Sequence, residues 1–343
     1  MEQKKKIRLA DIAKEIGVSS VTISKALTDK EGVSDDLRKQ IKQLAESMGY
    51  KTKKLKTVST SAGTTGNIGI LIPSRFFSRD SSYYWYLFNF LSKELLSRNY
   101  YSIMELLSDN DEKNLVLPRM ISDNKVDGLI VLGQTNDDYL EAVSKLYKTF
   151  ILLDFYSTKL DVDSVSNDDY YFSYKITNYV ISQGHKKLRF VGNFEATTSI
   201  CDRYMGFQKA MLENSLQTTI GEIIPDRDEN GKRIEIPLPE DMPTAFICNC
   251  DETAALLINQ LEEKGIKVPE DVSVSGYDNY VSNNKLDIGL TTVYIHPESI
   301  VRIAADLIIR KITGTPYMKG RHLVSGELII RESVQKNDFI SSN

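Results

Sequence analysis

The sequence is poor in the residue types on which disulfide scaffolds and metal sites depend. Its 343 residues include only three cysteines and three histidines. Three cysteines cannot form a disulfide framework, and so few are typical of a reducing compartment. Cys248 and Cys250 alternate along a predicted strand with no histidine nearby, so we expect no metal site.

Long apolar runs are missing as well. No stretch reaches the roughly 18 consecutive apolar residues that a membrane-spanning helix needs. The first residues, MEQKKK, lead into a polar helical pattern rather than into the apolar core of a signal peptide. We therefore expect a cytoplasmic protein that carries no cofactor.

The motifs of the common enzyme classes are also absent. The chain has no Gly-x-Ser-x-Gly elbow, no Walker loop and no zinc-ligand spacing. The segment NIGILIPS has too few glycines for a dinucleotide-binding fingerprint. His185, in QGHKK, has no obvious carboxylate partner and is more typical of a turn than of a general base. These absences favour a function other than catalysis.

What the chain does have is an uneven distribution of charge. Residues 1–58 contain 14 basic and 8 acidic residues, whereas the remainder contains 29 basic and 39 acidic residues. A basic head on an acidic body indicates that only the head meets a polyanion. A solvated lysine face would produce the same count, so the charge alone does not decide between the two.

Three short helical patterns fill the basic segment. The first ends at Gly17, because only glycine takes a positive φ cheaply at a tight turn. The second begins at Ser19 or Ser20, and the third follows Ser34. The predicted inward positions are Leu9, Ile12, Ala13 and Ile16, then Val21, Ile23, Ala26 and Leu27, then Leu37, Ile41, Leu44, Ala45 and Met48.

Two short helices about a glycine turn, closed by a third helix, form a helix-turn-helix arrangement. In that motif the N-terminal part of the second helix enters the major groove of DNA. Lys25 is the one long cation on the exposed side of this predicted helix, and a lysine can donate to guanine. Val21 could contact a thymine methyl group or belong to the core, and both interpretations stay open here.

These residues carry a family resemblance. The segment LADIAKEIGVSSVTISKAL, followed by VSDDLRKQIKQLAESMGY, resembles the DNA-binding head of the LacI/GalR family of transcriptional regulators. The resemblance implies that base and phosphate contacts come from the following residues: Arg8, Ser19, Ser20, Val21, Thr22, Ser24 and Lys25.

The next segment departs from the family pattern. After Gly49-Tyr50 the family usually has a proline, an asparagine, an alanine-rich turn and a leucine that wedges into the minor groove. This chain has KTKKLKTVSTSAGTTG instead, which we interpret as a linker over residues 51–66. Lys53 is then a candidate phosphate contact and Leu55 a candidate wedge. The expected domains are residues 1–50, this linker, and residues 67–343.

From residue 67 onwards, short β-rich runs alternate with amphipathic helical segments. The runs are NIGILIP, VDGLIVLG, TFILLDF, KLRFVGN, TAFICN and DVSVSGYD. The helical segments include YLFNFLSKELLSRN, YFSYKITNYVISQG, YMGFQKAMLEN and ETAALLINQLEEKG. This alternation predicts parallel sheets covered on both faces, and the length favours two lobes. Ligands of such folds bind at the carboxyl ends of the strands, here in the cleft between the lobes.

The body is similar to the same family. The matching segments are SNDDYYFSYKITNYVISQGHKKLRFVGN, DRYMGFQKAM and KVPEDVSVSGYDNY. The resemblance implies an α/β effector domain like that of periplasmic sugar-binding proteins, with sugars or, less often, purines as ligands. It aligns Asp168 with a family aspartate and Arg203 with the family arginine. Cys250 stands where the family usually has an amide.

Side chains at the ends of the predicted strands are the candidate effector ligands. A guanidinium and a carboxylate, such as Arg203 and Asp278, can together bind vicinal hydroxyl groups. Aromatic faces such as those of Tyr83 and Tyr84 stack on sugar rings. We expect Arg203 at the start of a helix, with a salt bridge to Asp202, Asp168 or another carboxylate as the purely structural alternative. The full set is Tyr83, Tyr84, Gln134, Asp154, Asp168, Arg203, Cys250 and Asp278.

The sequence thus predicts a homodimeric transcription regulator, most simply a repressor of a carbohydrate-utilisation operon. Two heads on a symmetric body would read a pseudo-palindromic operator, and a mono- or disaccharide in the cleft would control affinity. Two alternatives stay open. One is control by a purine or a phosphoprotein, and the other is a sugar-binding receptor without a role in gene regulation.

Overall fold

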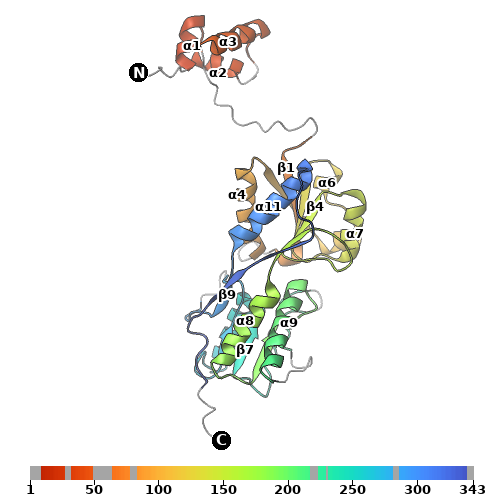
Figure 1. Cartoon of the computed structure of the whole chain (residues 1–343), viewed down its shortest axis with the longest axis vertical. Coiled ribbons are helices and arrows are strands. Elements are labelled where there is room, and N and C mark those ends of the chain that lie inside the picture. The colour runs from red at the N-terminus through yellow and green to blue at the C-terminus, as the bar shows by residue number, and fades with distance from the viewer. Residues whose placement is uncertain are drawn as a thin grey trace. The chain divides into compact units, whose positions relative to one another are not determined.

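The computed structural model describes residues 9–27, 32–48, 64–77, 83–216, 223–228, 231–280 and 286–337. The chain divides into two compact units, Met1–Ser61 and Ala62–Asn343, which are described separately (Figure 1). A small helical unit followed by an α/β unit with parallel sheets is the predicted fold class, and it is confirmed. Three predicted DNA contacts, Arg8, Lys53 and Leu55, lie outside the described residues, as does most of the predicted linker.

The first unit contains three helices around a small apolar core. They are α1 (Leu9–Ile16), α2 (Ser20–Leu27) and α3 (Asp35–Ser47). Each helix contributes a fully buried isoleucine, and the predicted inward positions other than Val21 are buried or half-buried: Leu9, Ile12, Ala13, Ile16, Ile23, Ala26, Leu27, Leu37, Ile41, Leu44, Ala45 and Met48. Helical spacing of apolar residues therefore accounts for this core.

The turn between α1 and α2 has the local chemistry that the sequence predicts. Gly17 has a φ of 75°, in the left-handed region that glycine adopts cheaply. The Ser19 hydroxyl accepts a hydrogen bond from the backbone N–H of Thr22 at 3.1 Å, so Ser19 caps the start of α2. The cap and the glycine together fix the angle at which α2 leaves α1.

The second unit begins with a lobe built on a six-stranded parallel sheet, in the order β10-β5-β4-β3-β1-β2. Its strands are β1 (Asn67–Pro73), β2 (Tyr101–Leu107), β3 (Gly128–Leu132), β4 (Phe150–Leu153), β5 (Ser164–Asn167) and β10 (Arg321–Val324). Its helices are η1 (Ser74–Phe76), α4 (Tyr83–Ser97), α5 (Asp109–Lys113), α6 (Arg119–Ser122), α7 (Asp137–Leu146) and α11 (Pro297–Thr313).

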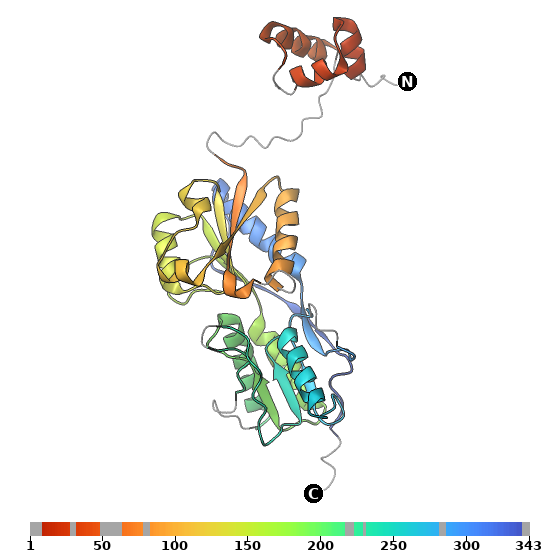
Figure 2. The same ribbon diagram turned by 180° about the vertical axis from the view of Figure 1, so that it is seen from behind.

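The alternation of side chains along the strands distributes this core over both faces of the sheet. Ile68, Ile70 and Ile72 of β1 pack with α4 and α11, whereas Leu71 packs with α6 and α7. Seen from behind, α4 and α11 lie together on one side of the strands (Figure 2). A parallel sheet covered on both faces is what the near-continuous apolar runs predict.

The second lobe repeats this plan on a smaller scale. Its sheet has the order β6-β7-β8, from β6 (Leu188–Val191), β7 (Ala245–Cys248) and β8 (Ser273–Ser275). One face is covered by two helices and the other by one: α8 (Asp169–Ser182), α9 (Thr198–Glu213) and, opposite them, α10 (Asp251–Glu263) (Figure 2).

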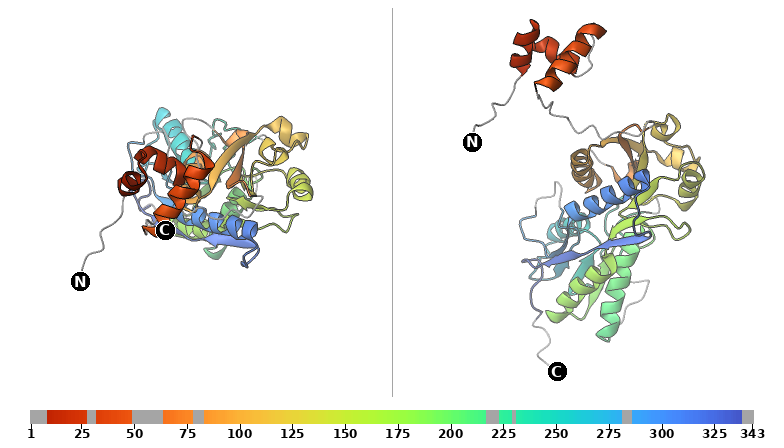
Figure 3. Two further views of the ribbon diagram at one scale, coloured as in Figure 1. Left: turned by 90° about the horizontal axis from the view of Figure 1, so that it is seen from above. Right: turned by 45° about the horizontal axis from the view of Figure 1, so that its top comes forward.

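The chain passes between the two lobes three times. It leaves the first lobe after β5 and returns from β9 (Thr292–Ile295) into α11. It crosses again from β10 to β11 (Gly326–Ile329), which pairs antiparallel with β9 (Figure 3). The carboxyl ends of the parallel strands consequently face a cleft between the lobes. None of the helices in the described part of the chain is long and apolar enough to span a bilayer.

Candidate nucleic-acid interface and ligand-binding cleft

The described DNA contacts predicted on and just before α2 differ in their exposure. Ser19, Ser20, Val21 and Lys25 are exposed, and Thr22 and Ser24 are half-buried. Val21 is 65% exposed, so the alternative that it belongs to the core is wrong. An apolar side chain left in water beside hydroxyls and a lysine is available for contact with a base edge.

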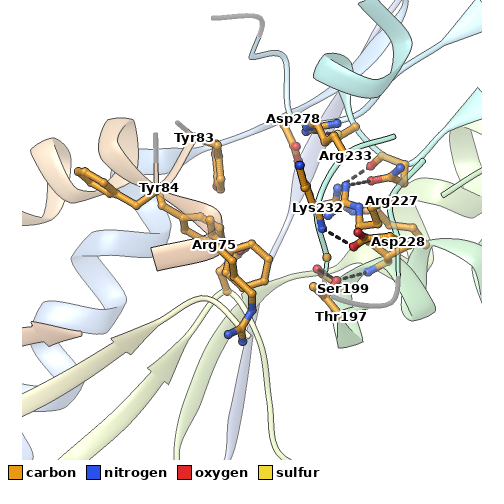
Figure 4. A pocket seen from close by; sticks show the side chains of 18 of the residues that line it. Arg75, Tyr83, Tyr84, Thr197, Ser199, Arg227, Asp228, Lys232, Arg233 and Asp278 are labelled. Carbon is orange, nitrogen blue, oxygen red and sulfur yellow. Dashed lines mark hydrogen bonds and ion pairs between the residues drawn. The ribbon is translucent and has the colours of Figure 1, made fainter. Parts of the chain in front are cut away.

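The cleft of the second unit contains a cavity of about 610 Å³ lined by both lobes. The first lobe's wall carries Tyr83, Tyr84 and Arg75, and the second lobe's wall carries charged residues that include Asp278, Arg227 and Arg233 (Figure 4). Asp154, which is bonded to Tyr84, also lines the cavity. Clefts of about 300–1,000 Å³ are the usual size for a small-molecule site. The lining residues come from the segments that follow the parallel strands, as the fold requires.

Arg203 lines the cavity from the second lobe. Helix α9 begins at Thr198, where Thr197 is the cap and accepts from the Ile200 N–H at 3.1 Å. Arg203 is therefore in the second turn, and the prediction that it starts the helix is wrong. From there its side chain turns inward and is only 6% exposed.

Four groups hold the Arg203 guanidinium. Its Nε donates to Asp169 Oδ1 at 2.8 Å, its Nη2 lies 3.0 Å from Asp278 Oδ1, and its Nη1 donates to the Asn249 carbonyl at 2.6 Å. The Tyr277 ring centroid lies 3.9 Å from its central carbon. The salt-bridge interpretation thus holds, but with Asp169 and Asp278 rather than with Asp202 or Asp168. Arg203 in turn orients the Asp278 carboxylate.

Asp168 has a different place from the one predicted. Its carboxylate accepts from the Tyr171 N–H at 3.3 Å and caps α8, and it is not among the described residues that line the cavity. Its neighbour Asp169 is 3% exposed and makes the contact with Arg203. The resemblance alone put the aspartate one position too early.

Two tyrosines and a carboxylate form the part of the first lobe's wall that lies opposite Arg203. Tyr84 donates to Asp154 Oδ2 at 3.0 Å, which leaves Asp154 Oδ1 buried with no partner in the described part of the chain. The hydroxyl of Tyr83 is likewise buried and has no partner there. Buried polar atoms are nearly always satisfied, so two such atoms beside a cavity point to a ligand that supplies their partners.

The carboxylates of the cleft are held in an environment that disfavours their charge. Burial, together with the nearby charge of Asp169, raises the pKa of Asp154 to about 7. Burial raises the pKa of Asp169 to about 6, even though Arg203 opposes the shift. Burial also raises the pKa of Asp278, again against the effect of Arg203. A ligand that donates hydrogen bonds to these oxygens would replace the missing solvation.

Two of these carboxylates also sit on unusual backbone. Asp154 has a φ of 71° and Asp278 a φ of 96°, in the left-handed region that non-glycine residues seldom adopt. Strain of this kind is maintained where the surrounding structure over-determines it, most often at ligand sites. The backbone therefore agrees with the side-chain chemistry in marking both residues.

The side chains of Gln134 and Cys250 contact other protein groups at the cleft. Gln134 Oε1 accepts from the Thr198 N–H at 3.0 Å and from its hydroxyl at 3.2 Å, so it bridges the two lobes. Cys250 lines the cavity with 8% exposure, and its sulfur lies 3.2 Å from the Thr253 hydroxyl and 3.6 Å from Arg233. Across the residues that the structure describes, no group of three or more His, Cys, Asp or Glu side chains could hold a metal ion.

Sequence reasoning missed a basic part of the wall. Arg227 makes a two-point contact with the buried Asp226, with distances of 3.0 and 2.8 Å. Burial alone would raise the pKa of Asp226, but Arg227 and hydrogen bonds from Thr253 and Asn249 lower it. This wall lies in irregular backbone, for which no periodicity is available. Arg75, by contrast, follows a predicted strand and could have been found by the rule that selected Asp154.

Comparisons with known proteins agree with both parts of the chain. Residues 8–53 match the family described as bacterial regulatory proteins, lacI family, and residues 177–334 match a periplasmic binding protein-like domain. The chain is similar to the HTH-type transcriptional repressor PurR of Histophilus somni (strain 129Pt), with 28% identity over 95% of this chain and 98% of that protein. PurR of Haemophilus influenzae (strain PittEE) is 26% identical over 95% of this chain and 98% of its own length.

Solved structures share the fold at low identity. A transcriptional regulator CelR–cellobiose complex has a TM-score of 0.68 and 18% identity, covering 95% of this chain and 99% of that one. The lac repressor dimer bound to operator and the anti-inducer ONPF has a TM-score of 0.66 and 17% identity, covering 96% of this chain and all of that one. Both similarities extend over the helical head and the two-lobed body.

Proposed function

The chain belongs to the LacI family of bacterial regulatory proteins, and from this premise we propose that it is a homodimeric DNA-binding repressor controlled by a sugar in the interlobe cleft. In this proposal the head reads the operator and the body senses the effector. The family is one of transcriptional regulators rather than enzymes.

The surface of α2 supports the first half of the proposal. Lys25 and the hydroxyls of Ser19 and Ser20 are exposed beside Val21, which is the mixture of donors and apolar surface that major-groove reading uses. One such helix reads only a few base pairs, so specificity requires two heads and a pseudo-palindromic site. A symmetric dimer is the simplest arrangement that provides them.

One observation carries the second half. Asp154 Oδ1 and Tyr83 Oη are buried without partners in the described residues, and both residues line the 610 Å³ cavity beside the Arg203–Asp278 pair. A ligand with several hydroxyl groups would donate to the carboxylates and pair with the tyrosine hydroxyl. It would also place its apolar ring face against the tyrosines.

A purine effector is the second candidate, because the PurR repressors are similar over almost the whole chain. The shape of the aromatic wall favours the sugar. The rings of Tyr83 and Tyr84 meet at 62°, and those of Phe76 and Tyr84 at 49°, so they form a curved wall rather than a parallel slot for a flat base. Similar folds bind cellobiose in CelR and ribose in an Enterococcus faecium regulator.

The proposed mechanism couples the cleft to the spacing of the two heads. The lobes are joined by three chain crossings and by hydrogen bonds such as that between Gln134 and Thr198, so a ligand that contacts both walls favours one lobe arrangement. The ligand can change DNA affinity only by as much as its own affinity differs between the two lobe arrangements. Moving the ratio of the two arrangements from 1:99 to 99:1 needs a difference of about 5.5 kcal/mol. A ligand held by charged hydrogen bonds from both lobes can supply a difference of that order.

The test uses the full chain and a DNA site enriched from a random pool. Pentoses, hexoses, disaccharides and the bases hypoxanthine and guanine are titrated by calorimetry, and operator affinity is measured with each ligand that binds. We expect a sugar to bind and to change operator affinity, and Asp154→Asn to abolish both effects without altering DNA binding in the absence of ligand. The matched control is Asp123→Asn, an exposed carboxylate outside the cleft.

Three results would overturn the proposal. Binding of a purine base instead of any sugar would replace the sugar with the second candidate. Failure to enrich any DNA sequence would contradict the DNA-binding half. Sugar binding that leaves operator affinity unchanged would separate the two halves and favour a receptor without regulatory function.

A further inference from the structure

The cleft contains a second cavity, of about 730 Å³, next to the one described above. The two share four lining residues, Arg75, Phe76, Asp109 and Gly231, so they are adjoining compartments of one cleft. We call the 610 Å³ cavity the inner compartment and the 730 Å³ cavity the outer compartment. Each alone has the size of a small-molecule site.

Arg75 stands at the junction of the two compartments. It follows β1 in η1, and its Nη2 donates to the Gln134 carbonyl at 2.7 Å. Its Nη1 lies 2.5 Å from Glu112 and 3.3 Å from Asp109, and its guanidinium lies 4.9 Å from the centre of the Phe76 ring. The Glu112 side chain is 2% exposed and the Asp109 side chain 71%, so Glu112 is the buried anchor of the arginine and Asp109 its accessible partner, and both line the outer compartment.

This arrangement repeats the one around Arg203 in the inner compartment. There the guanidinium is anchored by Asp169, whose side chain is 2% exposed, lies over the Tyr277 ring, and pairs with the more accessible Asp278. Each compartment thus has an arginine anchored by a buried carboxylate, stacked on an aromatic ring and paired with a second carboxylate that lines the cleft. Such an arginine–carboxylate pair offers a donor and an acceptor at the spacing of vicinal hydroxyls.

We propose that the outer compartment is a second sugar subsite, so that the effector is an oligosaccharide with one unit in each compartment. This inference rests on the proposed function, in which the inner compartment binds a sugar. Gly231 of the second lobe lies opposite Arg75, where a methyl group on the glycine would be 3.9 Å from the arginine side chain, so the compartments join beside this close approach, along Phe76 and Asp109.

The charge of the outer wall favours a neutral ligand. It includes Lys113 and Lys159 as well as Asp137 and Glu195, so both signs are present, with acidic residues in excess. A phosphorylated or carboxylated ligand would meet repulsion there, whereas hydroxyl groups can both donate to the acidic groups and accept from the basic ones. A neutral oligosaccharide is the class that this lining fits.

The experiment compares chain lengths with the full-length protein. A glycan array of mono- to tetrasaccharides identifies the tightest ligand, and calorimetry then gives its affinity and that of its component monosaccharide. We expect the tightest ligand to contain at least two units and its monosaccharide to bind more than tenfold more weakly. Because a charged hydrogen bond is worth about 1.5–3 kcal/mol, Asp109→Asn should weaken oligosaccharide binding about ten- to a hundredfold.

The variants distinguish the two compartments. Glu195→Gln, from the other lobe, should leave monosaccharide affinity within about twofold, because Glu195 lines the outer compartment and not the inner one. Asp109 lines both compartments, so Asp109→Asn is compared on the oligosaccharide alone. Both side chains are exposed, so folding is expected to be normal, and operator affinity without ligand verifies it. Asp123→Asn is the control and should change neither affinity.

Each outcome decides the inference. A monosaccharide that binds as tightly as any longer glycan, with no effect of Asp109→Asn or Glu195→Gln, overturns the outer subsite and leaves the proposed function intact. Binding of purines and no glycan overturns both. The subsite is supported if the oligosaccharide binds more tightly than its monosaccharide and if Asp109→Asn and Glu195→Gln both remove this gain in affinity.

Discussion

The two units of this chain use polar side chains in opposite ways. In the head, most of the described candidate DNA contacts are exposed, and an apolar core that includes three fully buried isoleucines holds the fold. In the body, the candidate ligand contacts are buried and bound to one another: Asp154, Asp169 and Arg203 are 5%, 3% and 6% exposed. Function and stability are therefore separable in the head and coupled in the body.

This difference follows from the ligands. DNA is large and is met by an exposed helix, so reading it requires no cavity. A small molecule is recognised by surrounding it, which forces charged groups out of water before the ligand arrives. Measuring both stability and binding for the same substitution, in the body and in the head, tests this contrast directly.

The largest effect is expected at Arg203. Arg203→Ala leaves the carboxylates of Asp169 and Asp278 buried without their cation, and breaking a buried pair in this way costs about 3–5 kcal/mol. Chemical denaturation of the full chain should show this loss in the body's transition, together with loss of the ligand response. Arg203 therefore supports the fold of the body as well as its ligand site.

A double variant provides the control. Arg203→Met combined with Asp169→Asn removes the buried carboxylate charge of Asp169 together with the guanidinium of Arg203. The double variant should therefore recover much of the stability that Arg203→Ala loses, without recovering ligand binding. Equal stability of wild type and Arg203→Ala would contradict the coupling of function and stability in the body.

Arg203 also illustrates how much of the site the sequence could predict. Arg203 was predicted from the family resemblance and from an expected place at a strand exit, and Asp278 from its place after a strand; the structure brings the two within 3.0 Å. Asp169 was not selected, because one position along the chain decides whether a side chain caps a helix or enters the core. Arg227 and Arg233 lie in irregular backbone, where local pattern has no period to report.

The fold was predictable for a related reason. The runs that became β1, β3, β4 and β7 are buried on both faces and are almost entirely apolar. Strand β5, with the sequence SVSN, is buried but polar, and β2 is an edge strand with mostly half-buried side chains. Neither carries the apolar signal, because their places are decided by pairing with neighbouring strands.

The second effect is a dependence on pH at Asp154. The pKa of Asp154 is about 7 in the fold against an ordinary value of 3.8, so the folded protein keeps this carboxyl protonated where the unfolded chain does not. The free energy of unfolding is therefore highest below about pH 4 and falls as the pH rises towards 7. The loss at pH 8 is about 2–4 kcal/mol. Asp154→Asn avoids it, because the amide carries no charge to bury.

Thermal and chemical denaturation at pH 4.5 and pH 8 check this expectation. The Asn variant should be close to wild type at the lower pH, clearly more stable at the higher pH, and unable to bind the effector at either. A variant that is less stable than wild type at pH 8 would show that the Asp154 carboxylate supports the fold.

The third effect belongs to the head. If Lys25 donates to a base, Lys25→Ala lowers affinity for the specific site by about 1–3 kcal/mol and leaves non-specific binding nearly unchanged. Because the side chain is exposed, the stability of the head should change by less than about 0.5 kcal/mol. Fluorescence anisotropy on specific and random DNA, with denaturation of the same samples, measures both. Equal losses on the two DNAs would make Lys25 a phosphate contact only.

The smallest effect is expected at Ser19, a residue of the head in which the two roles meet. Its hydroxyl caps α2 by accepting from the Thr22 N–H at 3.1 Å, and the same exposed side chain is a candidate phosphate contact. Ser19→Ala removes the cap and should destabilise the head by about 1 kcal/mol. Ser19→Asp retains a capping oxygen and adds a negative charge at the helix N-terminus, which favours the helix.

The two substitutions therefore move stability and DNA binding in different directions. Ser19→Asp should keep the stability of wild type, yet bind all DNA more weakly because its carboxylate approaches the phosphates, and the loss should grow as the salt concentration falls. Ser19→Ala should lose stability and only a little affinity. If Ser19→Asp binds DNA as wild type does at low salt, Ser19 is a cap alone, and the head then separates structure from function at this residue too.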